Sequence, residues 1–345
     1  MKLTRTKMRR AIGTFTLMAA AALIATLSAP QGRAQQPSSS EQVNTLMIHR
    51  QEMSNRAVEE TRTRRFEEGK SDSTFPSDMM VARKGGVVRA LTPEEQRALQ
   101  HNERGLELFS KGKLEPAMKE YQEAIRSDAK FAEAHNNLGS AYFAAGRFEE
   151  AAAAFRRACE LDADYGQAFF NLALAEIKLG HEKEANEMLD AALHAYNSAG
   201  EAHLKAGRFK EAEEAFRGML QIDPEYAPAL MRLGLVFNAA DRHEEAAQNV
   251  RRVVEREPAN AAAHEILAEA LYGLQKYEEA AASAERALKL SPNSPDAIYI
   301  AGLARASLGQ RDAALAHLAR LGQLKSPDLT QQLSDFINKK APAKQ

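Results

Sequence analysis

A small residue returns along the chain at a nearly constant interval, and this interval constrains the fold more than any other feature. The small residues, called the anchors from here on, are Gly105, Gly139, Ala173, Gly200, Gly234, Ala268 and Gly302. Consecutive anchors are 34, 34, 27, 34, 34 and 34 residues apart. Twelve residues after them stand Ala117, Ala151, Ala185, Ala212, Ala246, Ala280 and Ala314. Such a period predicts an array of stacked units, each too small to be stable alone.

Each period reads as two helices joined by a tight turn. Between Asn136 and Phe155, apolar residues recur three and four positions apart on both sides of Gly146, which is typical of amphipathic helices. We expect each anchor to lie where the two helices of its repeat cross, because a small side chain lets the backbones approach. The alanine twelve residues later is the expected facing residue, and a larger side chain there is expected to overpack the crossing.

Glycine stands at the turn of most periods. The turn glycines are Gly112, Gly146, Gly180, Gly207 and Gly309. Glycine adopts the left-handed backbone that ends many helices at little cost. Asp241 and Gln275 stand at the turns of the fifth and sixth periods. Glutamine tolerates that backbone less well than aspartate does, so we expect the sixth turn to have a different shape.

In its period, its small anchors and its turn glycines, the chain resembles the tetratricopeptide repeat family. The resemblance implies an all-α fold, a right-handed α-solenoid of about seven helix-turn-helix repeats over residues 92–328, with the first helices lining a concave groove. The repeats are framed as 98–131, 132–165, 166–192, 193–226, 227–260, 261–294 and 295–328. Thr92, Pro93 and Glu95 predict the start of the first helix. Residues 329–345 are expected to form a capping helix and a tail.

The third repeat is short, because its anchor is followed by the next after 27 residues in place of 34. We favour a truncated helix with a tight turn near Tyr196-Asn197-Ser198, since Asn-Ser is a turn signal. The alternative is one continuous helix from Glu182 to Ala199, because neither proline nor glycine interrupts that stretch. With either structure we expect the solenoid to change pitch there and to form two blocks, 92–192 and 193–339.

The N-terminal residues have the pattern of a secretory signal peptide over residues 1–34. A basic start is followed by the uncharged apolar run from Ala11 to Leu27 and by small residues. We favour cleavage over a retained N-terminal anchor, and either outcome exports the chain to the periplasm or the extracellular space. Residues 35–91 are interpreted as a mobile linker with a conditional helix at 41–68, or alternatively as a segment that folds on a partner.

Composition and motifs argue against catalysis and against nucleic-acid binding. The net charge is −1 with mixed signs, whereas a nucleic-acid binder needs a basic face. We find no catalytic motif, metal-ligand spacing or phosphate-binding loop, so no catalytic residue, metal or cofactor is predicted. Cys159 is the only cysteine, and we expect a buried thiol rather than an intermolecular disulfide.

The resemblance places candidate binding residues on the groove side of the first helices, chiefly three before, two before and one after each anchor. The candidates, with nearby bases included, are Asn102, Asn136, Asn137, Ser140, Phe170, Asn171, Leu174, Lys178, Lys205 and Arg232. Asparagine can hold the backbone of an extended peptide through paired donor and acceptor contacts. The alternative is that Asn137 and Asn171 pair within the solenoid. Some members of the family grip a C-terminal carboxylate with a clamp in which asparagines are joined by lysine and arginine. This chain does not match the full clamp, because its first repeat has Asn102 followed by Glu103.

These observations predict an exported, non-catalytic scaffold that binds a protein or an extended peptide in its groove, in cell-envelope assembly or secretion. Two alternatives stay open: a self-associating structural solenoid, and an accessory subunit of an envelope enzyme complex. We expect no nucleic-acid partner, membrane contact only through an uncleaved N-terminal segment, and a monomer in preference to a homo-oligomer.

Overall fold

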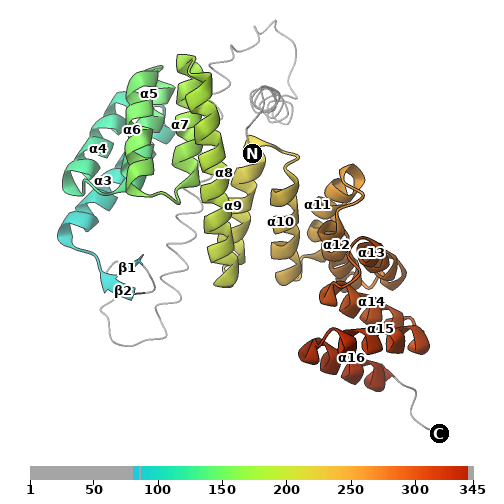
Figure 1. Ribbon diagram of the computed structural model, residues 1–345. Helices are drawn as coiled ribbons and strands as arrows, with labels where there is room; N and C mark the ends of the chain where they lie inside the picture. Colours follow the sequence, from blue (N-terminus) through green and yellow to red (C-terminus); the bar gives the residue numbers. More distant parts are fainter. Residues whose placement is uncertain (1–80, 85–86, 341–345) are drawn as a thin grey trace, which may run out of the picture. The chain divides into compact units, whose positions relative to one another are not determined.

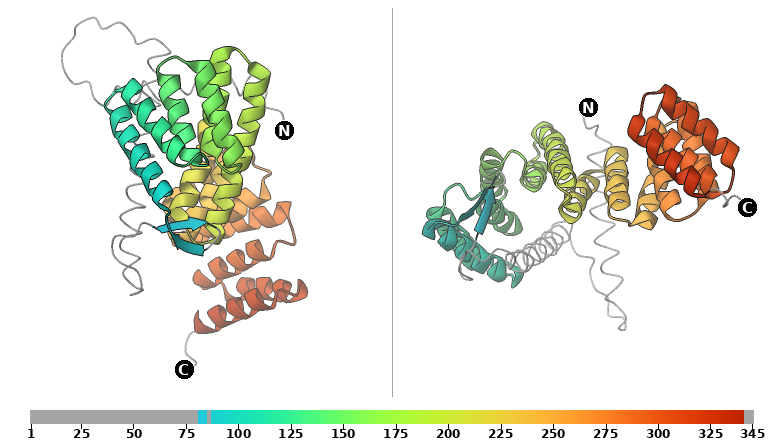
Figure 2. Two further views of the ribbon diagram at one scale, coloured as in Figure 1. Left: turned by 90° about the vertical axis from the view of Figure 1, so that its left-hand side faces the viewer. Right: turned by 90° about the horizontal axis from the view of Figure 1, so that it is seen from below.

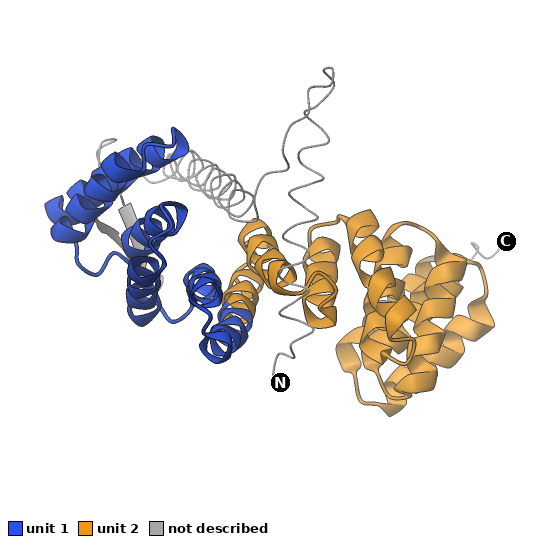
Figure 3. Cartoon of the chain, turned by 90° about the horizontal axis from the view of Figure 1, so that it is seen from above, with its two compact units in different colours: residues 1–195 blue, residues 196–345 orange. Residues whose placement is uncertain are grey.

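The computed structural model describes residues 81–84 and 87–340, which form two short strands followed by the helices α3 to α16 (Figure 1). This part of the chain is a helical solenoid, as predicted, and helices joined by short turns lie side by side within each unit (Figure 2). Contacts divide the chain into two compact units, unit 1 at Met1–Ala195 and unit 2 at Tyr196–Gln345 (Figure 3). None of the described helices is both long and apolar enough to cross a membrane.

The helices follow the repeat period. Unit 1 contains α3 (Pro93–Ser110), α4 (Leu114–Ser127), α5 (Ala132–Ala144), α6 (Phe148–Leu161) and α7 (Gly166–Leu179). Helix α8 (Glu182–Lys205) begins in unit 1 and ends in unit 2. Unit 2 continues with α9 (Phe209–Ile222), α10 (Ala227–Ala239), α11 (His243–Arg256), α12 (Ala261–Gly273), α13 (Tyr277–Leu290), α14 (Pro295–Ser307), α15 (Arg311–Gln323) and α16 (Pro327–Lys340).

The first and last helices end the array in different ways. At the start, the Thr92 hydroxyl accepts a hydrogen bond from the Glu95 backbone at 3.2 Å, and the Glu95 carboxylate accepts one from the Thr92 backbone at 2.9 Å. This reciprocal pair is the predicted capping box. At the other end, α16 packs on α14 and α15 and buries Leu333 and Ile337, which covers the apolar face of the last repeat.

A short hairpin lies within the segment that we interpreted as a mobile linker. Strand β1 (Val81–Lys84) pairs antiparallel with β2 (Val87–Ala90). The sequence analysis did not predict these strands, although valine favours an extended backbone and Gly85-Gly86 is a two-residue hairpin signal. The mobile linker over residues 35–91 remains a prediction. The predicted signal peptide at 1–34 and the helix at 41–68 lie outside the described residues.

Helix α8 corrects our preferred interpretation of the short repeat. It runs for 24 residues without the turn expected near Tyr196, so the frame boundary between the third and fourth repeats falls inside one helix. Ala185, Leu189, Ala192 and Tyr196 are all buried and continue one apolar stripe through the expected turn. Burial of this stripe outweighs the weak turn preference of Asn-Ser. The change of pitch remains a prediction.

The turn at Gln275 has the same backbone as the glycine turns, which contradicts the expected difference in shape. Gln275 has φ = 60°, and the turn glycines have φ between 70° and 82°. The backbone N–H of Gln275 donates to the Tyr272 carbonyl at 2.9 Å, and the backbone N–H of Lys276 donates to the Leu271 carbonyl at 2.9 Å. Packing of the next helix therefore imposes the left-handed backbone even where the residue disfavours it.

Because of this strain, Gln275→Gly is expected to stabilise the protein. A left-handed backbone costs a residue with a Cβ about 1 kcal/mol more than glycine, so the free energy of unfolding should rise by about that amount. Urea denaturation followed by circular dichroism measures the change. Gly146→Gln is the matched control and should destabilise by a similar amount. A lower stability of Gln275→Gly would contradict this account of the turn.

The first two glycine anchors lie against aromatic side chains. A Cβ built on Gly105 would lie 2.5 Å from the Tyr121 ring, and one built on Gly139 would lie 2.7 Å from the Phe155 ring. Each of these rings belongs to the residue sixteen positions after its anchor. Ala117 and Ala151 are fully buried as small core residues, and the prediction that the alanine twelve positions later faces the anchor remains a prediction.

Cys159 is buried in α6, as predicted, and is a free thiol. Burial raises the pKa of this thiol to about 12. Its reactive thiolate form is therefore scarce at neutral pH.

Candidate functional site

Most of the predicted binding residues lie on three consecutive first helices of unit 1. Asn102 belongs to α3, and Asn136, Asn137 and Ser140 belong to α5. Phe170, Asn171, Leu174 and Lys178 belong to α7. Helix α5 contacts both α3 and α7. We call this surface, formed by α3, α5 and α7, the first-helix face of unit 1.

The first pair of asparagines joins α5 to α3. The side-chain amide of Asn137 donates to Asn102 Oδ1 at 2.9 Å. Asn102 Nδ2 in turn donates to Glu133 Oε1 on α5 at 3.2 Å. Asn102 and Asn137 are 2% and 1% exposed, so their amides serve contacts inside the protein.

A second pair repeats this contact one repeat further along the chain. Asn171 Nδ2 on α7 donates to Asn136 Oδ1 on α5 at 2.9 Å, again between residues 35 positions apart. Gln167 Nε2 donates to Asn171 Oδ1 at 2.6 Å. Asn136 and Asn171 are both 3% exposed. The alternative that Asn137 and Asn171 pair within the solenoid thus describes their observed contacts, and direct contact with a partner remains a prediction.

The other candidates differ in how far they reach the surface. Ser140 is buried, and its hydroxyl donates to the Asn136 carbonyl at 3.0 Å. Phe170 is fully buried, whereas Leu174 and Lys178 are partly exposed. Glu133 and Gln167 are also partly exposed, and sequence reasoning missed both. They stand six positions before Gly139 and Ala173, so the repeat period carried a signal for them.

The two remaining candidates, Lys205 and Arg232, belong to unit 2. Lys205 is exposed at the end of α8. Arg232 on α10 pairs with Glu201 on α8, with Nη2 2.5 Å from Oε1. This ion pair links consecutive first helices, so the Arg232 charge is already compensated within the protein.

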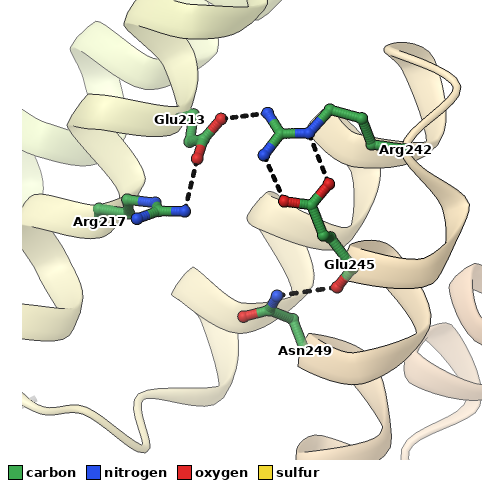
Figure 4. Close-up of polar contacts among 5 residues, drawn as sticks. All are labelled: Glu213, Arg217, Arg242, Glu245 and Asn249. Carbon is green, nitrogen blue, oxygen red and sulfur yellow. Dashed lines mark hydrogen bonds and ion pairs between the residues drawn. The ribbon is translucent and has the colours of Figure 1, made fainter.

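A second set of charged contacts links consecutive second helices of unit 2 (Figure 4). Arg242 forms a two-point contact with the Glu245 carboxylate at 2.7 and 2.5 Å, and its Nη1 lies 2.5 Å from Glu213 Oε2 on α9. Arg217 Nη2 lies 2.6 Å from Glu213 Oε1. The Arg242 guanidinium also lies 4.4 Å from the centre of the Phe237 ring. These contacts stabilise stacking between repeats, and we assign them a structural role.

Comparison with known proteins agrees with the repeat period. A family model described as TPR repeat matches residues 105–146 and 139–180, and one described as Tetratricopeptide repeat matches 170–227, 197–261 and 231–295. The matches run without a gap from residue 105 to residue 295, which is more than half of the 345 residues. The chain belongs to the tetratricopeptide repeat family. No curated protein matches the sequence.

Solved structures with the same kind of repeat are similar to this tetratricopeptide repeat chain. One, from Parabacteroides merdae, is 15% identical, with 70% of this chain and 99% of that chain covered and a TM-score of 0.38. The second TPR domain of Spaghetti, bound to an HSP90 peptide, is 31% identical, with 29% and 94% covered and a TM-score of 0.29. YrrB, described as having an unusual peptide-binding site, is 19% identical, with 62% and 97% covered and a TM-score of 0.36.

The tetratricopeptide repeats of unit 1 hold the Glu133 carboxyl in an environment that disfavours its charge. Burial raises the pKa of Glu133, hydrogen bonds from Asn102 and Asn137 lower it, and the nearby Glu103 raises it. The net direction is upward from the ordinary value of 4.5. A carboxyl with a raised pKa in the folded state binds its proton more tightly there than in the unfolded state.

This shift predicts how stability depends on pH. Protonated Glu133 stabilises the folded state, and this stabilisation is lost as the pH rises through the raised pKa of the folded state. At pH 7 the wild type therefore carries an unfavourable charge at this position. Glu133→Gln is neutral there, so it should be more stable than the wild type at pH 7. The difference should shrink as the pH falls towards 4.5, where the wild-type carboxyl also becomes neutral. Urea denaturation of both proteins between pH 4 and pH 8 measures it. A difference that is independent of pH would contradict the assignment.

Tyr121 carries a hydroxyl that finds no hydrogen-bond partner among the described residues, although the side chain is 0% exposed. Burial, and then the charge of Glu133, raise the pKa of Tyr121. The equivalent residues of the second and fourth tetratricopeptide repeats are Phe155 and Phe216, which have no hydroxyl.

Removing this hydroxyl is expected to stabilise the protein. A buried polar group without a partner costs about 1–3 kcal/mol, so Tyr121→Phe should raise the free energy of unfolding by about 1 kcal/mol. Thermal and urea denaturation measure the change. Tyr142→Phe is the control, because the Tyr142 hydroxyl accepts a hydrogen bond from Gln122 at 3.2 Å. That control should not gain stability. A loss of stability in Tyr121→Phe would show that the hydroxyl is satisfied.

Proposed function

We propose that this tetratricopeptide repeat protein is a non-catalytic scaffold that binds a segment of another protein on the first-helix face of unit 1. The observation that carries the proposal is the pair of Asn–Asn contacts, which hold α3, α5 and α7 in one register. A surface held in this way loses little conformational entropy when a partner binds. The partly exposed Glu133, Gln167, Leu174 and Lys178 lie on these helices and offer polar, apolar and charged contacts.

The binding proposal is tested by placing one large charged residue on this face. Leu174→Arg should abolish or strongly reduce the capture of partner proteins by the full-length protein, because the new side chain fills the surface of α7. Ala153→Arg introduces the same residue at an exposed position of α6 and should capture the same partners as the wild type. Circular dichroism confirms that both variants keep their helices. Equal capture by Leu174→Arg and by the wild type would contradict the proposal.

We also propose that the protein is exported and acts in cell-envelope assembly or secretion. The support is the sequence of residues 1–34, with its basic start, apolar run and small residues. Fusion of residues 1–40 to a reporter enzyme that is active only outside the cytoplasm should give an active reporter. Replacing Leu23 and Ile24 by Arg should abolish that activity, because charges prevent insertion of the apolar run. An inactive wild-type fusion would contradict export.

A further inference from the structure

Two carboxylates of unit 1 are held in contrasting ways. Glu176 on α7, whose side chain is 4% exposed, lies between Arg156 at 2.8 Å and His181 at 2.7 Å. Glu133 on α5 has hydrogen bonds from the neutral amides of Asn102 and Asn137, and among the described residues no lysine, arginine or histidine pairs with it. Glu103 adds negative charge nearby. A partly buried carboxylate in such surroundings gains from an external cation.

Tyr121 of α4 lies against Gly105 of α3 and is 0% exposed, so its hydroxyl is closed off from a partner protein. The Glu133 carboxylate is partly exposed on α5 and, within the described residues, accepts hydrogen bonds from neutral amides only. A cationic donor at this carboxylate would therefore be favourable.

We propose that the first-helix face of unit 1 binds a basic segment of the partner protein and pairs one of its arginine or lysine side chains with Glu133. This inference rests on the proposed function and adds the chemical class of the partner. The amides of Asn102 and Asn137 orient the carboxylate before binding, so the ion pair needs little rearrangement. Arginine suits the site better than lysine, because its planar group forms two parallel hydrogen bonds to a carboxylate.

The test measures binding of two fluorescein-labelled peptides to the full-length protein by fluorescence anisotropy. One twelve-residue peptide alternates serine with arginine, and the other alternates serine with glutamate. The arginine peptide should bind more tightly than the glutamate peptide, and more weakly at 300 mM than at 50 mM NaCl, because surface charges are screened. Equal affinity for the two peptides would overturn the proposal.

Substitutions locate the binding at Glu133. Glu133→Gln keeps the size of the side chain and one acceptor oxygen but removes the negative charge. It should weaken binding of the arginine peptide about tenfold, which is the effect of one charge-assisted pair. Glu149→Gln removes the same charge from an exposed position of α6 and should change the affinity less than about twofold. Equal losses in both variants would show attraction by net charge alone and would overturn the proposal. Because Glu133→Gln is expected to be more stable than the wild type at pH 7, lost binding does not reflect unfolding.

Three further outcomes separate this inference from its alternatives. Residues 62–65 contain Arg62, Arg64 and Arg65, so a segment of this chain is the competing occupant. If the arginine peptide binds only after these three arginines are replaced by serine, the chain's own segment occupies the face and the partner proposal is overturned. If Leu174→Arg abolishes capture of partners but Glu133→Gln changes neither capture nor peptide binding, this inference fails and the proposed function stands. If Leu174→Arg changes nothing, the proposed function fails.

Discussion

Gly139→Ala is expected to lower the free energy of unfolding by about 2 kcal/mol, although alanine is the better helix former. The added Cβ would lie 2.7 Å from two carbons of the Phe155 ring, and this ring is fully buried between α5 and α6. Neither the ring nor the backbone can move without disturbing the packing of the repeat. The overpacking cost therefore exceeds the gain in helix propensity.

The chain itself contains the compensating pair. Its third anchor is Ala173, and the residue sixteen positions later is Leu189, which is smaller than Phe155. Gly139→Ala combined with Phe155→Leu should therefore recover at least half of the stability that the glycine substitution costs. Urea denaturation of the two single variants and the double variant measures the coupling, which we expect to be about 1–2 kcal/mol. If the two losses simply add, the ring is not the obstacle.

Asn137→Ala is expected to be the second large effect, with a loss of about 2 kcal/mol. The substitution removes the donor to Asn102 Oδ1 and leaves that buried oxygen with an unmade hydrogen bond. It also removes a hydrogen bond to Glu133. Thermal denaturation of full-length protein measures the loss, and loss of amide protection at the contact of α3 with α5 localises it.

The control for this prediction is Asn197→Ala in α8. Asn197 is partly exposed, and its side chain contacts Glu201 within the same helix at 3.1 Å, so its removal should cost less than about 0.5 kcal/mol. Equal losses for Asn137→Ala and Asn197→Ala would show that the buried pair does not stabilise the stacking of α5 on α3.

Much of the candidate face followed from the repeat period, whereas its internal contacts did not. Counting from the anchors placed Asn102, Asn137 and Asn171 on consecutive first helices. Counting did not show that their amides face each other, because that depends on how far apart the helices lie. The repeat period also contained a signal for the packing of the anchors, which the sequence analysis did not use. Gly105 and Gly139 are followed sixteen residues later by Tyr121 and Phe155, so a missing side chain in one helix matches a large ring in the other.

The sequence by itself determined the helical repeat, most of its turns and the capping box at Thr92. These features depend on the identity of residues near each other in the chain, and period, glycine and capping chemistry are local signals. Only the tertiary structure decided that α8 runs through an Asn-Ser turn signal, that Gln275 adopts a left-handed backbone, and that the Tyr121 hydroxyl lacks a hydrogen-bond partner among the described residues. In each of these places, burial against a neighbouring helix outweighs the local preference, because packing contributes more free energy than the propensity of one residue.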